Sequence, residues 1–218
     1  MATSTATRAA PRRTQAERSA STRRRLLEAT LECLVEKGYA RTTIADIESR
    51  AGVSRGARLH HFRTKAILVA EAASHLYRTI AERYAEAIAR VGPEQDRFRE
   101  GLRLLWETYA DPTHAAVIEL YAAARTDAEL RDTLRELARV HRRDVRKRAN
   151  TYFPELARRD ASGLFETIQA ALTGLAVQRM VYGDRAPDQE VLEMIEHLVE
   201  TTFSDAQPQA EPREREAR

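Results

Sequence analysis

Residues 42–65 read TTIADIESRAGVSRGARLHHFRTK, and this stretch decides the fold of the N-terminal third of the chain. A capping threonine precedes a short helical segment that stops at Ala51 and Gly52. Gly52 is suited to a positive φ in a tight turn, and Val53 is apolar enough to hold that turn against a core. Ser54 is then a cap for a second short helix. The stretch therefore predicts a helix-turn-helix, whose second helix can enter the major groove of DNA.

The side chains of this motif divide into an inner and an outer set. We expect the small core to contain Ile44, Ile47, Ala51, Leu59 and Phe62. We expect the second helix to present Arg55, Gly56, Arg58 and His60 outward. The neighbouring His60 and His61 do not predict a metal site, because adjacent residues of a helix point in different directions.

The composition predicts an all-α protein. The chain has 218 residues, of which 43% are hydrophobic, with only 8 Gly and 7 Pro. Ala, Leu, Glu and Arg are abundant, and these are strong helix formers. Cys33 is the only cysteine, so an intrachain disulfide is excluded, and we expect it to be a small core residue.

Charge is distributed unevenly along the chain. The net charge is +3, but residues 1–65 carry 14 Lys and Arg against 6 Asp and Glu. This basic segment indicates a module that binds a polyanion. No apolar run approaches membrane-spanning length. The first 25 residues lack a secretory signal, and two interpretations of them remain open: a disordered basic arm that touches phosphates, or an organelle transit peptide.

Gly and Pro divide the chain into helical segments. The expected helices cover residues 21–37, 43–51, 54–61, 64–92, 94–110, 113–125, 127–150, 161–182 and 188–203, with approximate ends. We expect disordered segments at 1–20 and 205–218, a DNA-binding domain at 21–65, and a second domain at 66–204.

At this level of detail the chain resembles the TetR family of bacterial transcriptional repressors. The resemblance rests on the TT-x-x-x-I stretch that begins at Thr42, on AGVSRG at 51–56 and on LHHFRTK at 59–65. It implies a three-helix DNA-binding domain, a long fourth helix, and a variable ligand-binding and dimerisation domain. It also implies a homodimer on a palindromic operator in the bacterial cytoplasm, bound to the nucleoid and released by a small-molecule effector.

The resemblance assigns roles to single residues. It implies that Thr43 caps the second helix and meets a phosphate, and that Lys65 opens the fourth helix as a further phosphate contact. Ser54 and the residues after it match the start of the recognition helix, and His61 matches its end. The set of DNA-binding residues expected is Thr43, Ser54, Arg55, Gly56, Arg58, His60, His61 and Lys65.

The chain departs from the family pattern in two places. The family commonly has Leu-Tyr where this chain has Arg58 and Leu59, so a phosphate-contacting hydroxyl is missing. The family usually has Ala where this chain has Glu48. Because that small residue allows a close helix crossing, we expect Glu48 to bend outward or to pair with Arg50 or Arg55.

The second domain carries the candidate dimer and effector residues. Two apolar stripes indicate a dimeric four-helix bundle, or equally an intramolecular core: Leu164, Ile168, Leu172 and Leu175, with Leu192, Ile195, Leu198 and Val199. The residues expected to line an effector cavity are Phe98, Trp106, Tyr109, His114, Tyr121 and Arg125. Such aromatic walls favour an apolar or planar molecule.

No motif indicates catalysis or a cofactor: the sequence lacks a phosphate-binding glycine loop, a nucleophile elbow and an H-E-x-x-H motif. We therefore expect a ligand-responsive DNA-binding regulator and not an enzyme. Two rival functions remain: a protein of the same fold that binds lipid without DNA, and a nonspecific nucleoid protein.

Overall fold

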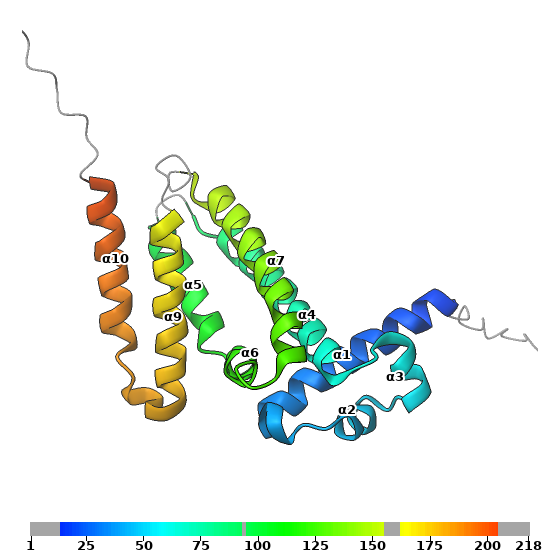
Figure 1. Cartoon of the computed structure of the whole chain (residues 1–218). Helices are drawn as coiled ribbons and strands as arrows, with labels where there is room; N and C mark the ends of the chain where they lie inside the picture. Colours follow the sequence, from blue (N-terminus) through cyan, green and yellow to red (C-terminus); the bar gives the residue numbers. More distant parts are fainter. Residues whose placement is uncertain (1–13, 93–94, 155–161, 205–218) are drawn as a thin grey trace, which may run out of the picture. The chain divides into compact units, whose positions relative to one another are not determined.

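The computed structural model describes residues 14–92, 95–154 and 162–204. All regular structure in these ranges is helical, which confirms the all-α prediction (Figure 1). The helices are α1 (Gln15–Arg41), α2 (Ile44–Ala51), α3 (Arg55–His61), α4 (Lys65–Ala89), α5 (Arg97–Tyr109), α6 (Pro112–Ala123), α7 (Ala128–Tyr152), α9 (Ser162–Tyr182) and α10 (Asp188–Ser204), with the 3-10 turn η1 (Gly183–Arg185).

Helix α1 begins earlier than the sequence suggested. Its cap is Thr14, whose hydroxyl accepts a hydrogen bond from the Glu17 amide, while the Glu17 carboxylate accepts one from the Thr14 amide. This reciprocal capping box stabilises the first turn. The prediction of disorder is therefore wrong for residues 14–20, whereas residues 1–13 and 205–218 lie outside the described residues.

Gly38 interrupts α1, close to where the sequence placed the end of the first helix. Its φ of 71° and ψ of 171° leave the helical region, and one further turn follows. A Cβ at this position would lie 2.8 Å from Oε1 of Glu119 on α6. The positive φ therefore favours glycine here, and any larger residue would also have to displace the Glu119 carboxylate.

The described helices form two compact units. One contains the chain up to Thr79 together with Ala116–Arg139, and the other contains Ile80–Ala115 and the chain from Val140 onward. Helices α4, α6 and α7 each contribute to both units. The division predicted at residue 65 follows function rather than packing, and it stays a prediction.

The first unit has its core among the N-terminal helices. Its fully buried apolar side chains include Leu26, Leu27, Leu34, Ile47, Leu68 and Val69. Burial of each such side chain contributes roughly 1.5–3 kcal/mol. Cys33 is buried beside them, as predicted, and burial raises the pKa of its thiol.

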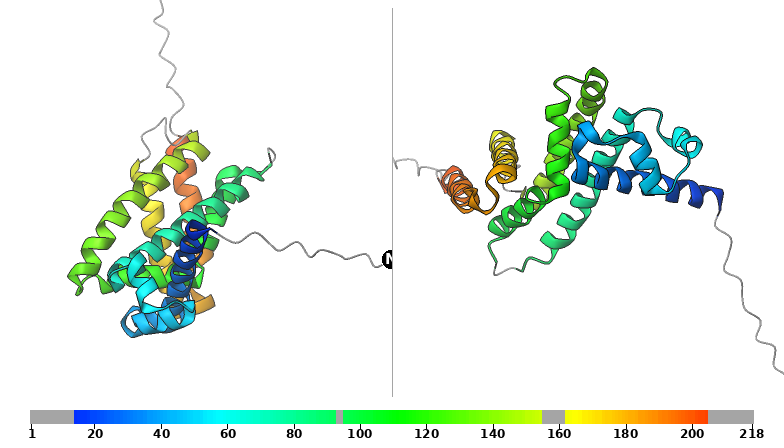
Figure 2. Two further views of the ribbon diagram at one scale, coloured as in Figure 1. Left: turned by 90° about the vertical axis from the view of Figure 1, so that its right-hand side faces the viewer. Right: turned by 90° about the horizontal axis from the view of Figure 1, so that it is seen from below.

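In the second unit, α9 and α10 pack against α5 and each other, and a hydrophobic cluster includes Phe98 of α5 and Leu164 of α9. Ile88 and Phe153 are buried at its centre, and Tyr84 donates a hydrogen bond to the carbonyl oxygen of Gly101 at 3.1 Å. A Cβ on Gly101 would lie 2.6 Å from the Phe153 ring, so this glycine permits close packing. Helices α9 and α10 lie side by side in Figures 1 and 2.

Candidate nucleic-acid interface

Local capping rules account for the geometry of the helix-turn-helix. Thr43 caps α2 in a reciprocal box with Asp46, and Ser54 caps α3 by accepting a hydrogen bond from the Ala57 amide at 3.3 Å. Gly52 has a φ of 59° and a ψ of 43°, the left-handed conformation predicted for the turn. All three predictions about the turn are confirmed.

Charged side chains fasten α2 to α1. The Lys37 ammonium lies 2.6 Å from the Asp46 carboxylate, and Lys37 together with Thr43 holds the pKa of Asp46 well below its usual range. Arg50 pairs with Glu36 of α1 and not with Glu48. Arg25 of α1 donates to the carbonyl oxygens of Ala51 and Gly52, which have no partner within α2.

Arg58 lies inside the motif, so the prediction that it faces outward is wrong. Its exposed fraction is only 6%. Its Nε donates to Oε1 of Glu48 at 2.9 Å, and its Nη1 donates to the carbonyl oxygens of Phe62 and Arg63 at 3.0 and 3.2 Å. The guanidinium is buried with a carboxylate and two carbonyls, which offset the loss of its hydration. Glu48 and Arg58, which both depart from the family pattern, therefore form one feature, a buried ion pair.

Leu59 faces outward, as Arg58 was predicted to do. Its exposed fraction is 44%, so its assignment to the core is wrong. Successive helical residues point about 100° apart, and the inward direction of Arg58 turns Leu59 outward. The other predicted core residues behave as expected, since Ile47, Ala51 and Phe62 are buried and Ile44 is partly buried.

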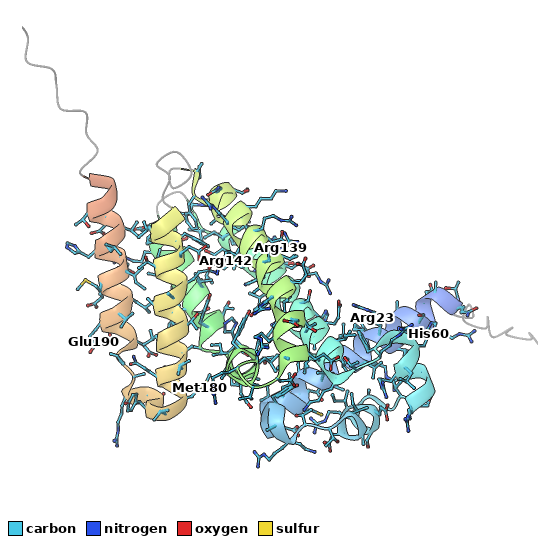
Figure 3. The ribbon with its side chains drawn as sticks, viewed as in Figure 1. Arg23, His60, Arg139, Arg142, Met180 and Glu190 are labelled. Atoms are coloured by element: carbon cyan, nitrogen blue, oxygen red, sulfur yellow. The ribbon has the colours of Figure 1, made fainter. Side chains whose placement is uncertain are left out.

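The outer side of α3 is exposed and basic. Arg55, Gly56 and His60 are exposed, and a Cβ on Gly56 would meet nothing within 4 Å. His60 is labelled in Figure 3. His61 is half-buried, and burial together with His60 and Arg23 lowers its pKa. The structure therefore leaves three of the four predicted base-contact candidates exposed on α3.

Lys65 makes an internal contact that sequence reasoning missed. Its ammonium donates to the carbonyl oxygen of Tyr39 at 2.6 Å and lies 4.0 Å from the centre of the Tyr39 ring. Tyr39 also donates from its hydroxyl to Asp127 at 2.8 Å and from its amide to Glu119 at 2.9 Å. Within the first unit, Tyr39 thus connects the segment before α2 with α6 and the start of α7.

The effector candidates fall in both units. Phe98, Trp106, Tyr109 and His114 belong to the second unit, whereas Tyr121 and Arg125 belong to the first and are exposed. Phe98 packs edge-on against Phe153. The rings of Tyr109 and His114 lie 4.4 Å apart. Burial, and secondly the charge of His141, lowers the pKa of His114 to about 4, so His114 is neutral at pH 7.

The predicted dimer stripes describe the interior of one chain. Ile168, Leu172, Leu175, Ile195 and Val199 are buried, and Leu164 and Leu192 are partly buried. The buried set is therefore covered within one chain, as the intramolecular alternative expects, and a dimeric bundle of these helices stays a prediction. The large apolar side chains that α9 and α10 leave exposed are Val177, Met180, Val181, Tyr182, Met194 and Leu198.

In residues 14–92, 95–154 and 162–204, no group of three or more His, Cys, Asp or Glu side chains is placed to hold a metal ion. Among the described helices, none combines the length and apolar content that a membrane-spanning segment needs.

Comparison with known proteins identifies both parts of the chain. Residues 26–72 match the family model for bacterial regulatory proteins of the tetR family, and residues 98–204 match that of the BetI-type transcriptional repressor C-terminal region. The HTH-type transcriptional regulator CymR of Pseudomonas putida is 36% identical over 176 residues, which cover 80% of this chain and 87% of CymR.

Solved structures share the fold. The transcriptional regulator SCO7518 of Streptomyces coelicolor A3(2) superposes with a TM-score of 0.60 at 24% identity, over 82% of this chain and 98% of its own. A regulator of Saccharomonospora viridis, solved in complex with choline, gives a TM-score of 0.61 at 18% identity, over 83% and 96% of the two chains. From the match to CymR over most of its length, the chain belongs to the TetR family of ligand-responsive, DNA-binding transcriptional regulators.

Proposed function

We propose that this regulator is a homodimeric repressor, which binds a palindromic operator and leaves it when a small molecule binds. The observation that carries the proposal is the exposed side of α3, where Arg55, Gly56 and His60 are all exposed and a Cβ on Gly56 would have open space. A short capped helix with such a side fits the major groove, and Arg is the commonest side chain for reading guanine. Its place of action is the bacterial chromosome, in the cytoplasm.

Phosphate contacts would set the register of α3 on the duplex. Thr43 and Ser54 are exposed caps at the starts of α2 and α3. Helix N-termini attract phosphate oxygens, and such contacts position a protein without reading sequence. Lys65 contributes to this surface only if its ammonium leaves the Tyr39 carbonyl, so we assign the phosphate contacts first to the two caps.

The dimer would form through the apolar side of α9 and α10 that one chain leaves exposed. On α9, Val177 and Val181 are one turn apart and exposed by 43% and 77%, and Gly174 has open space where a Cβ would stand. On α10, Met194 is 65% exposed. Exposed apolar side chains grouped on two adjacent helices suit a four-helix interface between copies.

Association is tested by replacing Val177 or Met194 with Glu and measuring the molar mass by light scattering. The expected result is a dimer for the native chain and a monomer for each variant. Val35→Glu on α1 is the matched control, because Val35 is 44% exposed and lies in the other unit. A variant that stays dimeric would remove α9 and α10 from the interface.

The effector would bind in the second unit, near Trp106, Tyr109 and His114. These side chains are buried, and His114 is neutral at pH 7 because burial lowers its pKa to about 4. A neutral imidazole does not supply the positive charge that an anionic effector needs, so we assign the site to apolar or aromatic molecules. Binding releases DNA only if the effector prefers the conformer that fits the operator poorly.

Trp106 is the only tryptophan, so its fluorescence reports directly on this region. Apolar and aromatic compounds are titrated against the native protein, and those that change the fluorescence are tested for release of DNA. Trp106→Phe is the silent control. Compounds that change the fluorescence but never release DNA would contradict the assigned response.

DNA binding is tested by gel retardation on DNA flanking the gene, and by selection from random duplexes. Arg55→Ala is expected to weaken operator binding by about 1–3 kcal/mol, the usual loss for a bidentate base contact. Arg135→Ala on α7 is a charge-matched control, because Arg135 is 71% exposed and pairs with Asp132 on its own helix. Equal affinity for all sequences, with a steep salt dependence, would instead indicate a nonspecific nucleoid protein.

The rival function, a lipid-binding protein of this fold without DNA binding, is not favoured, because the relatives are named as transcriptional regulators.

A further inference from the structure

Leu59 is an apolar side chain on an otherwise polar recognition surface. It follows Arg55 by four residues and is directly followed by His60, and all three are exposed. Residues four apart lie on the same face of a helix, so Leu59 stands next to Arg55. The recognition side of α3 therefore combines a cation, an imidazole and one large apolar side chain.

The rotation of α3 that exposes Leu59 is fixed by Arg58. The Arg58 guanidinium is tied to Glu48 on α2 and to the carbonyl oxygens of Phe62 and Arg63. A small rotation that would bury Leu59 would also expose Arg58 and break these bonds. The exposure of Leu59 is thus a consequence of the buried ion pair and not of a loose side chain.

Exposure alone does not mark a binding residue, because single exposed apolar side chains are common. Val35 on α1 illustrates this, since it is exposed to the same extent, 44%. Val35 stands three residues after Glu32 and directly before Glu36, and both carboxylates pair with Arg50. Leu59 differs because it shares its helix face with the arginine expected in the major groove.

We propose that Leu59 reads the C5-methyl group of a thymine in the operator, a proposal that rests on the DNA-binding function. A leucine side chain has no hydrogen-bond donor or acceptor, and the thymine methyl is the apolar feature of the major-groove edge. Four residues of helix rise about 6 Å and one base pair rises about 3.4 Å. The thymine is therefore within about two base pairs of the base that Arg55 contacts.

The probe is an operator in which each thymine is replaced in turn by deoxyuridine, which lacks only the methyl group. Removing one buried methyl contact is expected to raise the Kd about fourfold in one half-site, and about fifteenfold in both. With Leu59→Ala, the Kd for the thymine operator is expected to rise by a similar factor. Deoxyuridine at the same position is expected to cause no further loss in this variant.

Two variants and two outcomes make the test decisive. Leu59→Met keeps an apolar side chain and is expected to keep the deoxyuridine effect, and Val35→Ala is expected to match the native protein throughout. The proposal is overturned if deoxyuridine is tolerated at every position by the native protein. It is also overturned if Leu59→Ala shows the same deoxyuridine losses as the native protein. In that case another residue contacts the thymine methyl, and Leu59 contacts only the sugar or phosphate.

Failure of the DNA-binding function itself gives a different result. In that case selection recovers no operator, and the folded native protein retards no duplex even at low salt. Melting temperatures of the variants, measured by circular dichroism, separate a lost contact from a lost fold. Because Leu59 is nearly half exposed, its truncation is expected to leave the melting temperature close to that of the native chain.

Discussion

Arg58 in the first unit and His114 in the second are buried to almost the same extent, with exposed fractions of 6% and 7%. The two units accommodate these buried basic side chains in opposite ways. The Arg58 guanidinium is matched by the Glu48 carboxylate and two carbonyls. His114 loses its charge, because burial lowers its pKa to about 4. A permanent charge fixes the orientation of α3, whereas a group that sheds its proton leaves its surroundings sensitive to pH.

Breaking the Arg58 pair is expected to have the largest effect on stability. Arg58→Ala leaves Glu48 mostly buried without its partner, and loss of one member of a buried pair lowers the free energy of unfolding by about 3–5 kcal/mol. Urea unfolding followed by circular dichroism measures this loss. The variant is also expected to bind the operator weakly, because α3 loses the bonds that set its rotation.

The double variant Glu48→Ala with Arg58→Leu sharpens the first result. It removes both charges together and installs the small and apolar residues that the family commonly has at these positions. Replacing a whole buried ion pair by apolar side chains is often neutral or stabilising. A double variant as unstable as Arg58→Ala would contradict the assignment of the loss to an unpaired Glu48.

The second unit is expected to lose stability on acidification. His114 has an ordinary pKa near 6.5 when unfolded and a pKa of about 4 when folded. Above pH 6.5 both states are neutral and the stability is complete. As the pH falls from 6.5 towards 4, only the unfolded state binds the proton, and on the order of 3 kcal/mol is lost.

The control for this titration must separate His114 from its neighbour. His141 also has a pKa lowered to about 4 by burial, so it adds a similar slope over the same range. Asp111 opposes the shift of His114, and Asp144 opposes that of His141. His114→Asn is expected to reduce the dependence of the free energy of unfolding on pH by about half. An unchanged slope would show that His114 is not held neutral.

Lys65 is intermediate between Arg58 and His114, and its replacement is expected to have a smaller effect on the free energy of unfolding. It is half-buried and has no carboxylate within ion-pair distance among the described residues. Its charge is instead matched by the Tyr39 carbonyl and ring, and burial lowers its pKa. Lys65→Met is expected to lower the free energy of unfolding by about 1–2 kcal/mol, the sum of a modest hydrogen bond and a cation–π contact.

A matched variant shows which part of Tyr39 accounts for the loss expected in Lys65→Met. Tyr39→Phe keeps the ring and the backbone carbonyl but removes the hydroxyl that donates to Asp127. If Lys65 acts through the ring and carbonyl, Lys65→Met is expected to cause the same loss in the Tyr39→Phe background as in the native chain. Urea unfolding of the two single variants and the double variant measures this. Strong non-additivity would mean that Lys65 acts through the Tyr39 hydroxyl instead.

In the first unit, the sequence could predict features set by neighbouring residues but not those set by a distant pairing. The caps at Thr43 and Ser54 and the turn at Gly52 follow local rules, so a few neighbouring residues predict them. Which of Arg58 and Leu59 faces inward depends on Glu48, ten residues earlier, and local rules do not contain that information. The available signal was the coincidence of two opposite charges at two unusual positions.

The second unit shows a different limit of sequence reasoning. The stripes of α9 and α10 correctly identified apolar faces, including Leu172 and Ile195, but periodicity cannot say whether such a face meets its own chain or another. These side chains are buried within one chain, and whether α9 and α10 also meet a partner stays a prediction. The effector residues stay a prediction, and aromatic spacing does not reveal that Tyr121 and His114 belong to different units.

The smallest effect is expected at the exposed pair between Arg50 and Glu36. These side chains are 29% and 52% exposed, so water already screens both charges. Exposed pairs contribute about 0–1 kcal/mol, and Glu36→Gln is expected to change the free energy of unfolding by no more than about 0.5 kcal/mol. Urea unfolding at low and high salt measures the change. A loss comparable to that of Arg58→Ala would break the comparison, because burial would then not decide how much an arginine contributes to this motif.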